Sequence, residues 1–211
     1  MTSIMLVDDH AVVREGYRCL IEKHKDLTVV AEAPDGQTAY RLYKQLKPDV
    51  VVLDLSMPGK GGIEIVRQLR QWDASARVLV FTMHQNAAYA LQAFQAGAKG
   101  YVTKCSAPDL LVGAIRDVAA GKTAISPDVS HALALARISD DRDLLESLTA
   151  REFDIFRMLT DAKSVAEIAT TLNLSPKTVS NYHYLIKSKL GATSDIELVH
   201  LALRAKVVGP R

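Results

Sequence analysis

Five short and nearly continuous apolar runs, spaced along about the first 120 residues, constrain the fold more than any other feature of this sequence. They cover residues 4–7, 27–31, 50–53, 78–81 and 100–102. Between them lie amphipathic segments whose apolar residues recur at helical spacing, as Ile63, Val66 and Leu69 do. Five strand–helix repeats predict an α/β fold with a five-stranded parallel sheet, because strands covered by helices on both faces must be apolar throughout.

The rest of the chain has a different pattern, which predicts a small all-α domain of four short helices. A serine or threonine is followed three residues later by glutamate at Thr149/Glu152, Ser164/Glu167 and Ser194/Glu197, which predicts three capping boxes. Ser175 before Pro176 predicts another helix start. The stretch from Gly121 to Ser147 carries Gly, Ser, Asp and Pro and the strongly charged run Asp140-Asp141-Arg142-Asp143, so residues 122–146 are interpreted as a linker with a helical portion at 129–137. The expected domains are therefore 1–121 and 147–211.

Composition excludes several classes of protein. Hydrophobic residues make up 48% of the chain and charged residues 24%, and the net charge is +2, as in an ordinary globular protein. The two cysteines, Cys19 and Cys105, lie far apart, which favours a reducing compartment and argues against a disulfide framework or a zinc site. No apolar run is long enough to span a membrane, and Asp8 and Asp9 come too early for a signal peptide. We therefore expect a cytoplasmic protein with no membrane partner.

Polar side chains follow four of the five predicted strands. Asp8 and Asp9 come after the first, Asp54 after the third, Thr82 at the end of the fourth and Lys104 after the fifth. Ligands of open α/β sheets bind beyond the carboxyl ends of the strands, so these groups are expected to converge. Clustered carboxylates need a cation, and an all-oxygen site suits Mg²⁺ or Mn²⁺. Each residue alone could be an exposed strand end or a helix cap, but together they favour a site in which Asp54 is the nucleophile.

These motifs resemble the receiver domains of two-component response regulators. The resemblance rests on Val7-Asp8-Asp9-His10, Asp54-Leu55-Ser56-Met57-Pro58-Gly59, Phe81-Thr82 and Gly100-Tyr101-Val102-Thr103-Lys104. It implies a flavodoxin-like fold and an Asp54 that accepts a phosphoryl group from a sensor histidine kinase. It also implies that Asp9 binds magnesium directly and Asp8 mostly through water, with the backbone carbonyl of Ser56 as a further ligand. Lys104 would then pair with the phosphoryl oxygens.

The same resemblance implies a conformational switch. Thr82 would move toward the phosphoryl group, and Tyr101 would turn inward to fill the space that Thr82 leaves. An aromatic residue at position 101 could also be simple packing on the last strand. Gly61 stands where many members of the family carry aspartate, and we expect this to be a surface position without weight for the mechanism.

The helical part contains a helix, a tight turn around Leu172 to Ser175, and a second helix. That arrangement can place the second helix in the major groove of DNA. One face of this helix is apolar, whereas the opposite face carries Lys177, Ser180, Asn181, Tyr184 and Ser188. Lysines 177, 187 and 189 add a local basic character without any acid between residues 175 and 190. From the pattern alone, a plain solvated face is as good an interpretation as DNA binding.

A second resemblance favours DNA binding. The segments Leu148-Thr149-Ala150-Arg151-Glu152, Ser175-Pro176-Lys177-Thr178-Val179 and Lys189-Leu190-Gly191 are similar to the LuxR-type helix-turn-helix. The whole chain then resembles the NarL/FixJ class, and the stretch from Thr178 to Tyr184 is similar to the GacA/UvrY subgroup. The resemblance implies double-stranded DNA as a partner. The last predicted helix, Asp195 to Lys206, is more apolar than a lone surface helix needs, which favours a homodimer formed on phosphorylation or on DNA, although packing against the other three helices would also account for it. Bases would be contacted by Ser180, Asn181 and Tyr184, and phosphates by Lys177, Thr178 and Lys187.

The function expected from these patterns is transcription regulation controlled by phosphorylation, with no enzymatic activity beyond phosphorylation and dephosphorylation of Asp54 itself. A phosphorylation-independent regulator with a degenerate receiver is the alternative. A phosphatase of the haloacid dehalogenase type would carry its nucleophile after the first strand in a DxDxT pattern. The sequence there is Asp8-Asp9-His10-Ala11-Val12, which does not fit that pattern.

Overall fold

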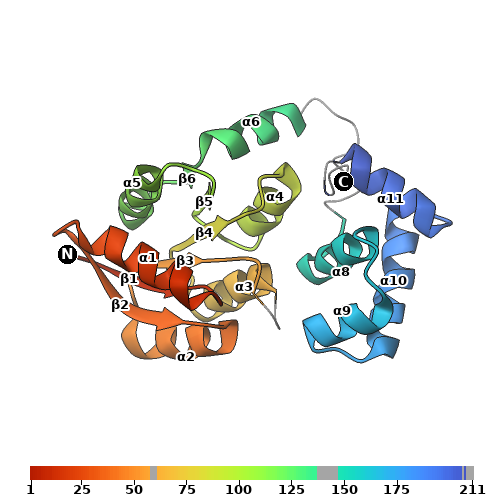
Figure 1. Cartoon of the computed structure of the whole chain (residues 1–211), viewed down its shortest axis with the longest axis horizontal. Coiled ribbons are helices and arrows are strands. Elements are labelled where there is room, and N and C mark those ends of the chain that lie inside the picture. Colours follow the sequence, from red (N-terminus) through yellow and green to blue (C-terminus); the bar gives the residue numbers. More distant parts are fainter. Residues whose placement is uncertain (58–60, 137–146, 206, 208–211) are drawn as a thin grey trace.

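In the computed structural model, which describes residues 1–57, 61–136, 147–205 and 207, the N-terminal part of the chain is a parallel sheet flanked by helices (Figure 1). Its strands are β1 (Thr2–Val7), β2 (Leu27–Ala33), β3 (Val50–Leu53), β4 (Val78–Thr82), β5 (Gly100–Thr103) and β6 (Ala124–Ile125). Its helices are α1 (Ala11–Glu22), α2 (Gly36–Leu46), α3 (Gly62–Trp72), α4 (Ala87–Gln95), α5 (Pro108–Ala119) and α6 (Pro127–Ala136). The strand order β2-β1-β3-β4-β5-β6 confirms the predicted flavodoxin-like architecture. We call β1 to α6 the α/β part.

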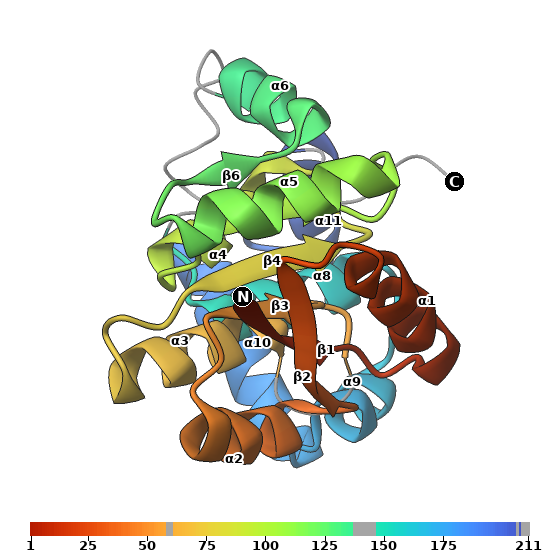
Figure 2. The same ribbon diagram turned by 90° about the vertical axis from the view of Figure 1, so that its left-hand side faces the viewer.

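The central strands β3, β4 and β5 are buried on both faces of the sheet, whereas Val30 of edge strand β2 and Ile125 of edge strand β6 are exposed. In β1, Ile4 and Leu6 pack in one core together with residues of α1 and α5. Met5 and Val7 point the other way, into a second core that includes residues of α2, α3 and α4. Figure 2 shows α1 on one side of β1 and β2 and α3 on the other. Because the central strands leave no face to water, alternation of polar and apolar residues is absent in them, as the continuous apolar runs predicted.

The sheet has one strand more than the five that the sequence predicts. Strand β6 follows residue 121 and pairs in parallel with Gly100 and Tyr101 of β5. A Cβ atom on Gly100 would lie only 3.0 Å from the carbonyl oxygen of Ala124, so the missing side chain lets this strand approach. With two residues, β6 is too short to show any periodicity. Helix α6 confirms the helical portion predicted within residues 122–146, and residues 137–146 lie outside the described part.

The C-terminal part is helical, as predicted. It contains α8 (Ala150–Thr160), α9 (Val165–Leu172), α10 (Pro176–Leu190) and α11 (Asp195–Arg204), and we call it the helical part. Thr149/Glu152 and Ser164/Glu167 form the two predicted capping boxes. Only one of the two hydrogen bonds of the third predicted capping box forms. Ser194 accepts from the amide of Glu197, but the Glu197 carboxylate accepts from the amide of Thr193 and not from that of Ser194, so this half of the prediction is wrong. Among the described residues, no helix combines the length and apolar character that crossing a membrane requires.

The two parts contact each other through α8, which faces α3 and α4 (Figure 1). The side-chain amide of Gln92 donates to the carbonyl of Leu148 at 2.9 Å, within a buried contact. Gly61 is buried here, and a Cβ atom on it would lie 2.2 Å from Oδ2 of Asp154. The expectation that position 61 is an inconsequential surface position is therefore wrong. The sequence could not show this, because the contact joins residues 93 positions apart.

Asp154 is expected to weaken the packing of α8 at neutral pH. Burial raises the pKa of this carboxyl to about 6, and nearby Arg157 and Arg151 offset only part of that effect, while Glu64 of α3 adds to it. A raised pKa means that the folded state holds the proton more tightly. The neutral Asp154 carboxyl therefore makes its full contribution to stability below about pH 4, and this contribution is lost as the pH rises through about 6. Asp154→Asn should stabilise the chain by about 1–2 kcal/mol at pH 8, a value discounted for partial solvent exposure.

Urea unfolding of both proteins at several pH values measures this difference. The gain from Asp154→Asn should shrink toward zero near pH 4, where the wild-type carboxyl is also neutral. Asp109→Asn is the matched control, since Asp109 is exposed on α5, and its effect should stay within about 0.5 kcal/mol at every pH. A gain that did not depend on pH would contradict a burial-raised pKa as the cause.

Candidate functional site

The predicted convergence of charged groups at the carboxyl edge of the sheet is present. Strands β1 and β3 are neighbours, and the amide of Asp54 donates to the carbonyl of Val7 at 2.9 Å, which holds the starts of the two following loops together. Lys104, just after β5, reaches across this edge. Its Nζ atom lies 2.5 Å from Oδ2 of Asp8 and 2.6 Å from Oδ2 of Asp54. Three residues that are far apart in the sequence thus form one ion cluster.

This ion cluster is largely shielded from water. The side chains of Lys104, Asp8 and Asp54 are 9%, 8% and 3% exposed. Burial by itself lowers the pKa of the Lys104 ammonium, but the hydrogen bonds to Asp54 and Asp8 outweigh it, and the net shift is upward. The Lys104 side chain therefore stays protonated, and its single positive charge balances one of the two carboxylates that it binds. A net negative charge remains at this edge, which suits a further cation.

Asp8, Asp9 and His10 form a second group, in which one ligand atom from each lies within 4.8 Å of the others. Oδ1 of Asp9 is buried and forms no hydrogen bond within the described part of the chain, although Nδ1 of His10 lies 2.9 Å away. An orphaned, buried carboxylate oxygen beside a second carboxylate fits a hard divalent cation such as Mg²⁺ or Mn²⁺. Asp54 is not in this group; it is joined to Asp8 through Lys104. His10 was not among the predicted site residues.

The predicted switch residues lie on neighbouring strands, Thr82 at the end of β4 and Tyr101 in β5. Thr82 and Tyr101 are both completely buried, so Tyr101 is turned inward. Its hydroxyl donates to the carbonyl of His84 at 2.9 Å, and burial raises its pKa far above the usual value. Nε2 of His84 lies 3.1 Å from Oγ of Ser56, whose amide donates to Oδ1 of Asp54 at 3.2 Å. His84 was missed by the sequence analysis, because a single histidine without ligand spacing gives no signal.

Helix α10 presents the polar face that the sequence predicts. Ser175 caps it by accepting from the amide of Thr178, and Val179 and Ile186 are buried against the rest of the helical part. Four of the six predicted DNA contacts are exposed: Lys177, Ser180, Asn181 and Tyr184. Tyr184 is 75% exposed, which is a high exposure for a large aromatic residue.

The other two predicted DNA contacts are partly engaged within the chain. Thr178 lies within hydrogen-bonding distance of the Ser175 hydroxyl at 2.8 Å, and Lys187 binds Asp195 at 2.9 Å. Lys189, which the sequence analysis counted in the basic face, binds Glu152 at 2.7 Å. The basic character of this face is therefore weaker than the count of lysines suggested, since two of the three are paired with acids from other helices.

Known proteins share both parts of this chain. A family model described as the response regulator receiver domain matches residues 4–116, and one described as bacterial regulatory proteins of the luxR family matches residues 146–202. Response regulator UvrY of Escherichia coli K12 is 40% identical over 206 residues, which cover 97% of this chain and 94% of UvrY. Response regulator GacA of Pseudomonas aeruginosa is 39% identical over 210 residues, covering 99% and 98% of the two chains.

Solved structures agree with these relatives. RcsB from Salmonella enterica serovar Typhimurium, bound to promoter P1flhDC in the presence of the phosphomimetic BeF₃⁻, is 28% identical with a TM-score of 0.71, and the match covers 98% of this chain and 99% of that one. A LuxR-family response regulator from Aurantimonas sp. SI85-9A1 is 57% identical with a TM-score of 0.65, covering 66% and 99%. The chain therefore belongs to the two-component response regulators, as a member that joins a receiver domain to a LuxR-type DNA-binding domain.

Proposed function

We propose that phosphorylation of Asp54 by a sensor histidine kinase controls this response regulator. The observation that carries the proposal is the position of Lys104, whose ammonium bridges Asp8 and Asp54 in a shielded site. An oxygen of Asp54 attacks the phosphorus, and the bond from phosphorus to the kinase imidazole breaks, so that the imidazole leaves with its electron pair. Lys104 would exchange a carboxylate oxygen for a phosphoryl oxygen, because phosphoryl transfer needs mainly positioning and charge neutralisation.

The residues that would hold Mg²⁺ or Mn²⁺ are Asp8, Asp9, Asp54 and the backbone carbonyl of Ser56. When bound, the cation would neutralise charge on the transferred phosphoryl group. Thr82 would act as the residue that senses the phosphoryl group, and the inward position of Tyr101 is the one that the switch requires. Turnover of the Asp54 phosphoryl group would be the only chemistry of the chain, which would otherwise act by binding.

The output would be sequence-specific binding of double-stranded DNA by α10. Ser180, Asn181 and Tyr184 would contact bases, and Lys177, Thr178 and Lys187 would contact phosphates, with Lys187 exchanging Asp195 for a phosphate oxygen. A solved structure of RcsB contains two dimers bound to two parallel DNAs, and we propose that this chain also binds as a homodimer. Ile196 and Leu203 on α11, 69% and 43% exposed, offer an apolar contact for it.

The proposed assignment of the chain is residues 1–121 as receiver, 122–146 as linker and 147–211 as DNA-binding domain. The family models end at residue 116 and begin at residue 146, which supports these boundaries. A protein that receives its signal from a kinase and delivers it to DNA would act in the cytoplasm. Strand β6 and helix α6 belong to the segment that would serve as linker.

Intact mass after incubation with magnesium and acetyl phosphate tests the proposal. The wild-type chain is expected to gain one phosphoryl group, and Asp54→Asn none. Failure of the wild type to gain mass, together with failure to bind the phosphate mimic beryllofluoride, would overturn the proposal in favour of a regulator with a degenerate receiver.

A further inference from the structure

The surface through which the two parts meet is built around Tyr89 of α4. This ring is buried, and it meets the fully buried ring of Phe153 of α8 edge to face, with centroids 4.9 Å apart. The guanidinium carbon of Arg157 lies 6.0 Å from the centroid of the Tyr89 ring. Aromatic pairs of this geometry stabilise a contact beyond the area that they bury. Tyr89 is therefore a receiver side chain that would transmit a movement of α4 to α8.

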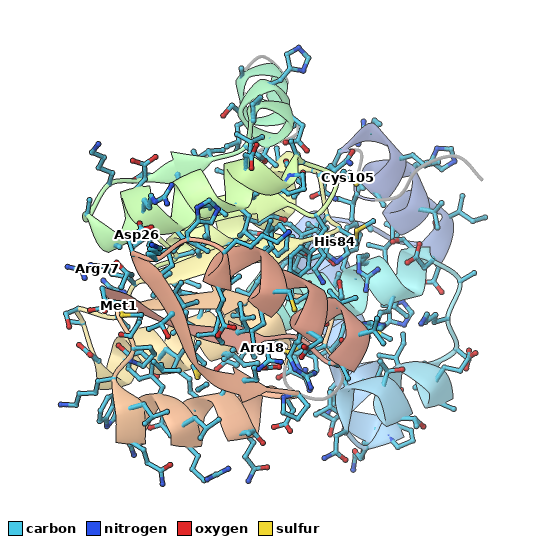
Figure 3. The ribbon with its side chains drawn as sticks, turned by 60° about the vertical axis from the view of Figure 1, so that its left-hand side comes forward. Met1, Arg18, Asp26, Arg77, His84 and Cys105 are labelled. Carbon is cyan, nitrogen blue, oxygen red and sulfur yellow. The ribbon has the colours of Figure 1, made fainter. Side chains whose placement is uncertain are left out.

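Tyr89 is joined to the ion cluster by His84. The two rings are stacked, with centroids 4.1 Å apart and planes 12° from parallel. Burial, together with the nearby charge of Arg157, lowers the pKa of His84 to about 4. In Figure 3, His84 lies where the receiver meets the cyan helix α8.

One other contact of His84 leads to Asp54 through Ser56, and two join His84 to the predicted switch residues. Its side chain meets the Ser56 hydroxyl at 3.1 Å, and its carbonyl accepts from the Tyr101 hydroxyl at 2.9 Å. Its amide lies 3.5 Å from Oγ1 of Thr82. A rearrangement of Thr82 or Tyr101 therefore cannot leave the backbone of residue 84 unaffected. A continuous series of contacts therefore joins Asp54 to α8.

Docking through α8 leaves the proposed reading face of α10 open. Lys177, Ser180, Asn181 and Tyr184 are exposed although the two parts are in contact. Figure 1 shows α10 and α11 on the side of the helical part that is turned away from the receiver. The receiver therefore does not cover the DNA-reading residues in this arrangement, and control does not require the two parts to separate.

We propose that the stacked pair His84–Tyr89 transmits the state of the Asp54 site to the docked DNA-binding domain through Phe153. The inference rests on the proposed function, since it supposes that Asp54 is the phosphoacceptor. Phosphorylation would hold the loop after β4 in one arrangement, and the stacked rings would pass that restraint to α8. The coupling is between two sites of one docked chain, so it acts by favouring one conformation rather than by releasing a covered surface.

Amide hydrogen exchange of the full chain, with and without beryllofluoride and magnesium, tests this relay. In the wild type, beryllofluoride should slow exchange in α8 by at least about fivefold, the lower end of the range for coupled sites. In Tyr89→Leu, exchange in the loop around Asp54 should still respond, but the response of α8 should be lost. The matched control is Trp72→Leu, which removes another edge-to-face ring at a distance from α8 and should behave as the wild type.

A second variant keeps the test decisive if Tyr89→Leu folds poorly. Gly61→Asp leaves both relay rings intact but places a carboxylate against that of Asp154, so it should separate the two parts and abolish the response of α8. Its affinity for a random-sequence DNA duplex at low salt should not exceed that of the wild type. A higher affinity would identify docking as inhibitory and overturn the proposal.

The remaining outcomes separate the relay from the function on which it rests. An α8 response in Tyr89→Leu equal to that of the wild type would overturn the relay alone. So would protection of the Asp54 loop in the wild type without any change in α8. If beryllofluoride protected neither region of the wild type, the proposed phosphorylation of Asp54 would fail, and the relay with it.

Discussion

Replacing Lys104 with methionine is expected to destabilise the chain by about 3–5 kcal/mol at neutral pH without divalent cations, because removing one member of a buried ion cluster leaves uncompensated charge. Methionine keeps most of the volume of the lysine stem, so the packing is conserved while the ammonium is lost. Asp8 and Asp54 would then face each other at one shielded edge with no cation between them. The pairing of β1 with β3 places the two carboxylates at one edge, and Lys104 is the cation that bridges them.

Urea unfolding in the presence of a chelator measures this loss, and repetition with magnesium tests its cause. Magnesium is expected to restore a substantial part of the stability, because a divalent cation neutralises the same carboxylates. Lys99→Met is the matched control: Lys99 is exposed, so the change should stay within about 0.5 kcal/mol. A loss below about 1 kcal/mol for Lys104→Met, or one that magnesium did not reduce, would contradict an electrostatic role for Lys104 in holding the site.

Truncation of Asn181 or Tyr184 to alanine is expected to weaken specific DNA binding by about 1–3 kcal/mol each, which is roughly 5- to 150-fold. Both side chains are exposed on α10, so neither change should alter the free energy of unfolding by more than about 0.5 kcal/mol. The loss should fall on particular base pairs, since a side chain that reads a base edge discriminates only at the position it contacts.

Fluorescence titration with a duplex selected by the wild-type chain from a random pool measures the loss. Lys177→Gln serves as the contrast, because a phosphate contact carries no sequence information. It should weaken binding to all duplexes equally and lower the slope of log affinity against log salt by about 1. Equal losses for Asn181→Ala on specific and random duplexes would place Asn181 on the phosphate backbone instead of a base.

The sequence predicted the sheet and the convergence of its charged residues because both depend on local patterns. Strands buried on both faces must be apolar along their whole length, so residues 50–53 and 78–81 could be recognised as strands. Parallel strands all end at the same edge, so Asp8, Asp54 and Lys104 had to be near one another once the strands were placed. The N-caps at Thr149, Ser164 and Ser175 were equally local, since each cap and its partner lie within one turn of helix.

Features that the spacing of residues along the chain does not specify were missed. Strand β6 consists of two residues, and only its pairing with Gly100 and Tyr101 identifies it. Glu197 bonds to the amide of Thr193 and not to that of Ser194, a choice between neighbouring amides that the spacing of residues does not specify. Lys187 and Lys189 were counted as free cations, but the packing of α10 against α8 and α11 brings Glu152 and Asp195 to them.

The most consequential of these missed features is the contact between the two parts. The spacing of apolar residues in α4 and α8 predicts that each helix buries one face. It does not predict which segment covers that face, because any apolar partner of suitable shape can do so. Only the tertiary structure decided that Tyr89 packs on Phe153, that Gly61 admits the carboxylate of Asp154, and that α10 lies on the side of the helical part turned away from the receiver. The hydrophobic effect is not directional, so the identity of each partner follows from shape complementarity in three dimensions, which periodicity along the chain does not encode.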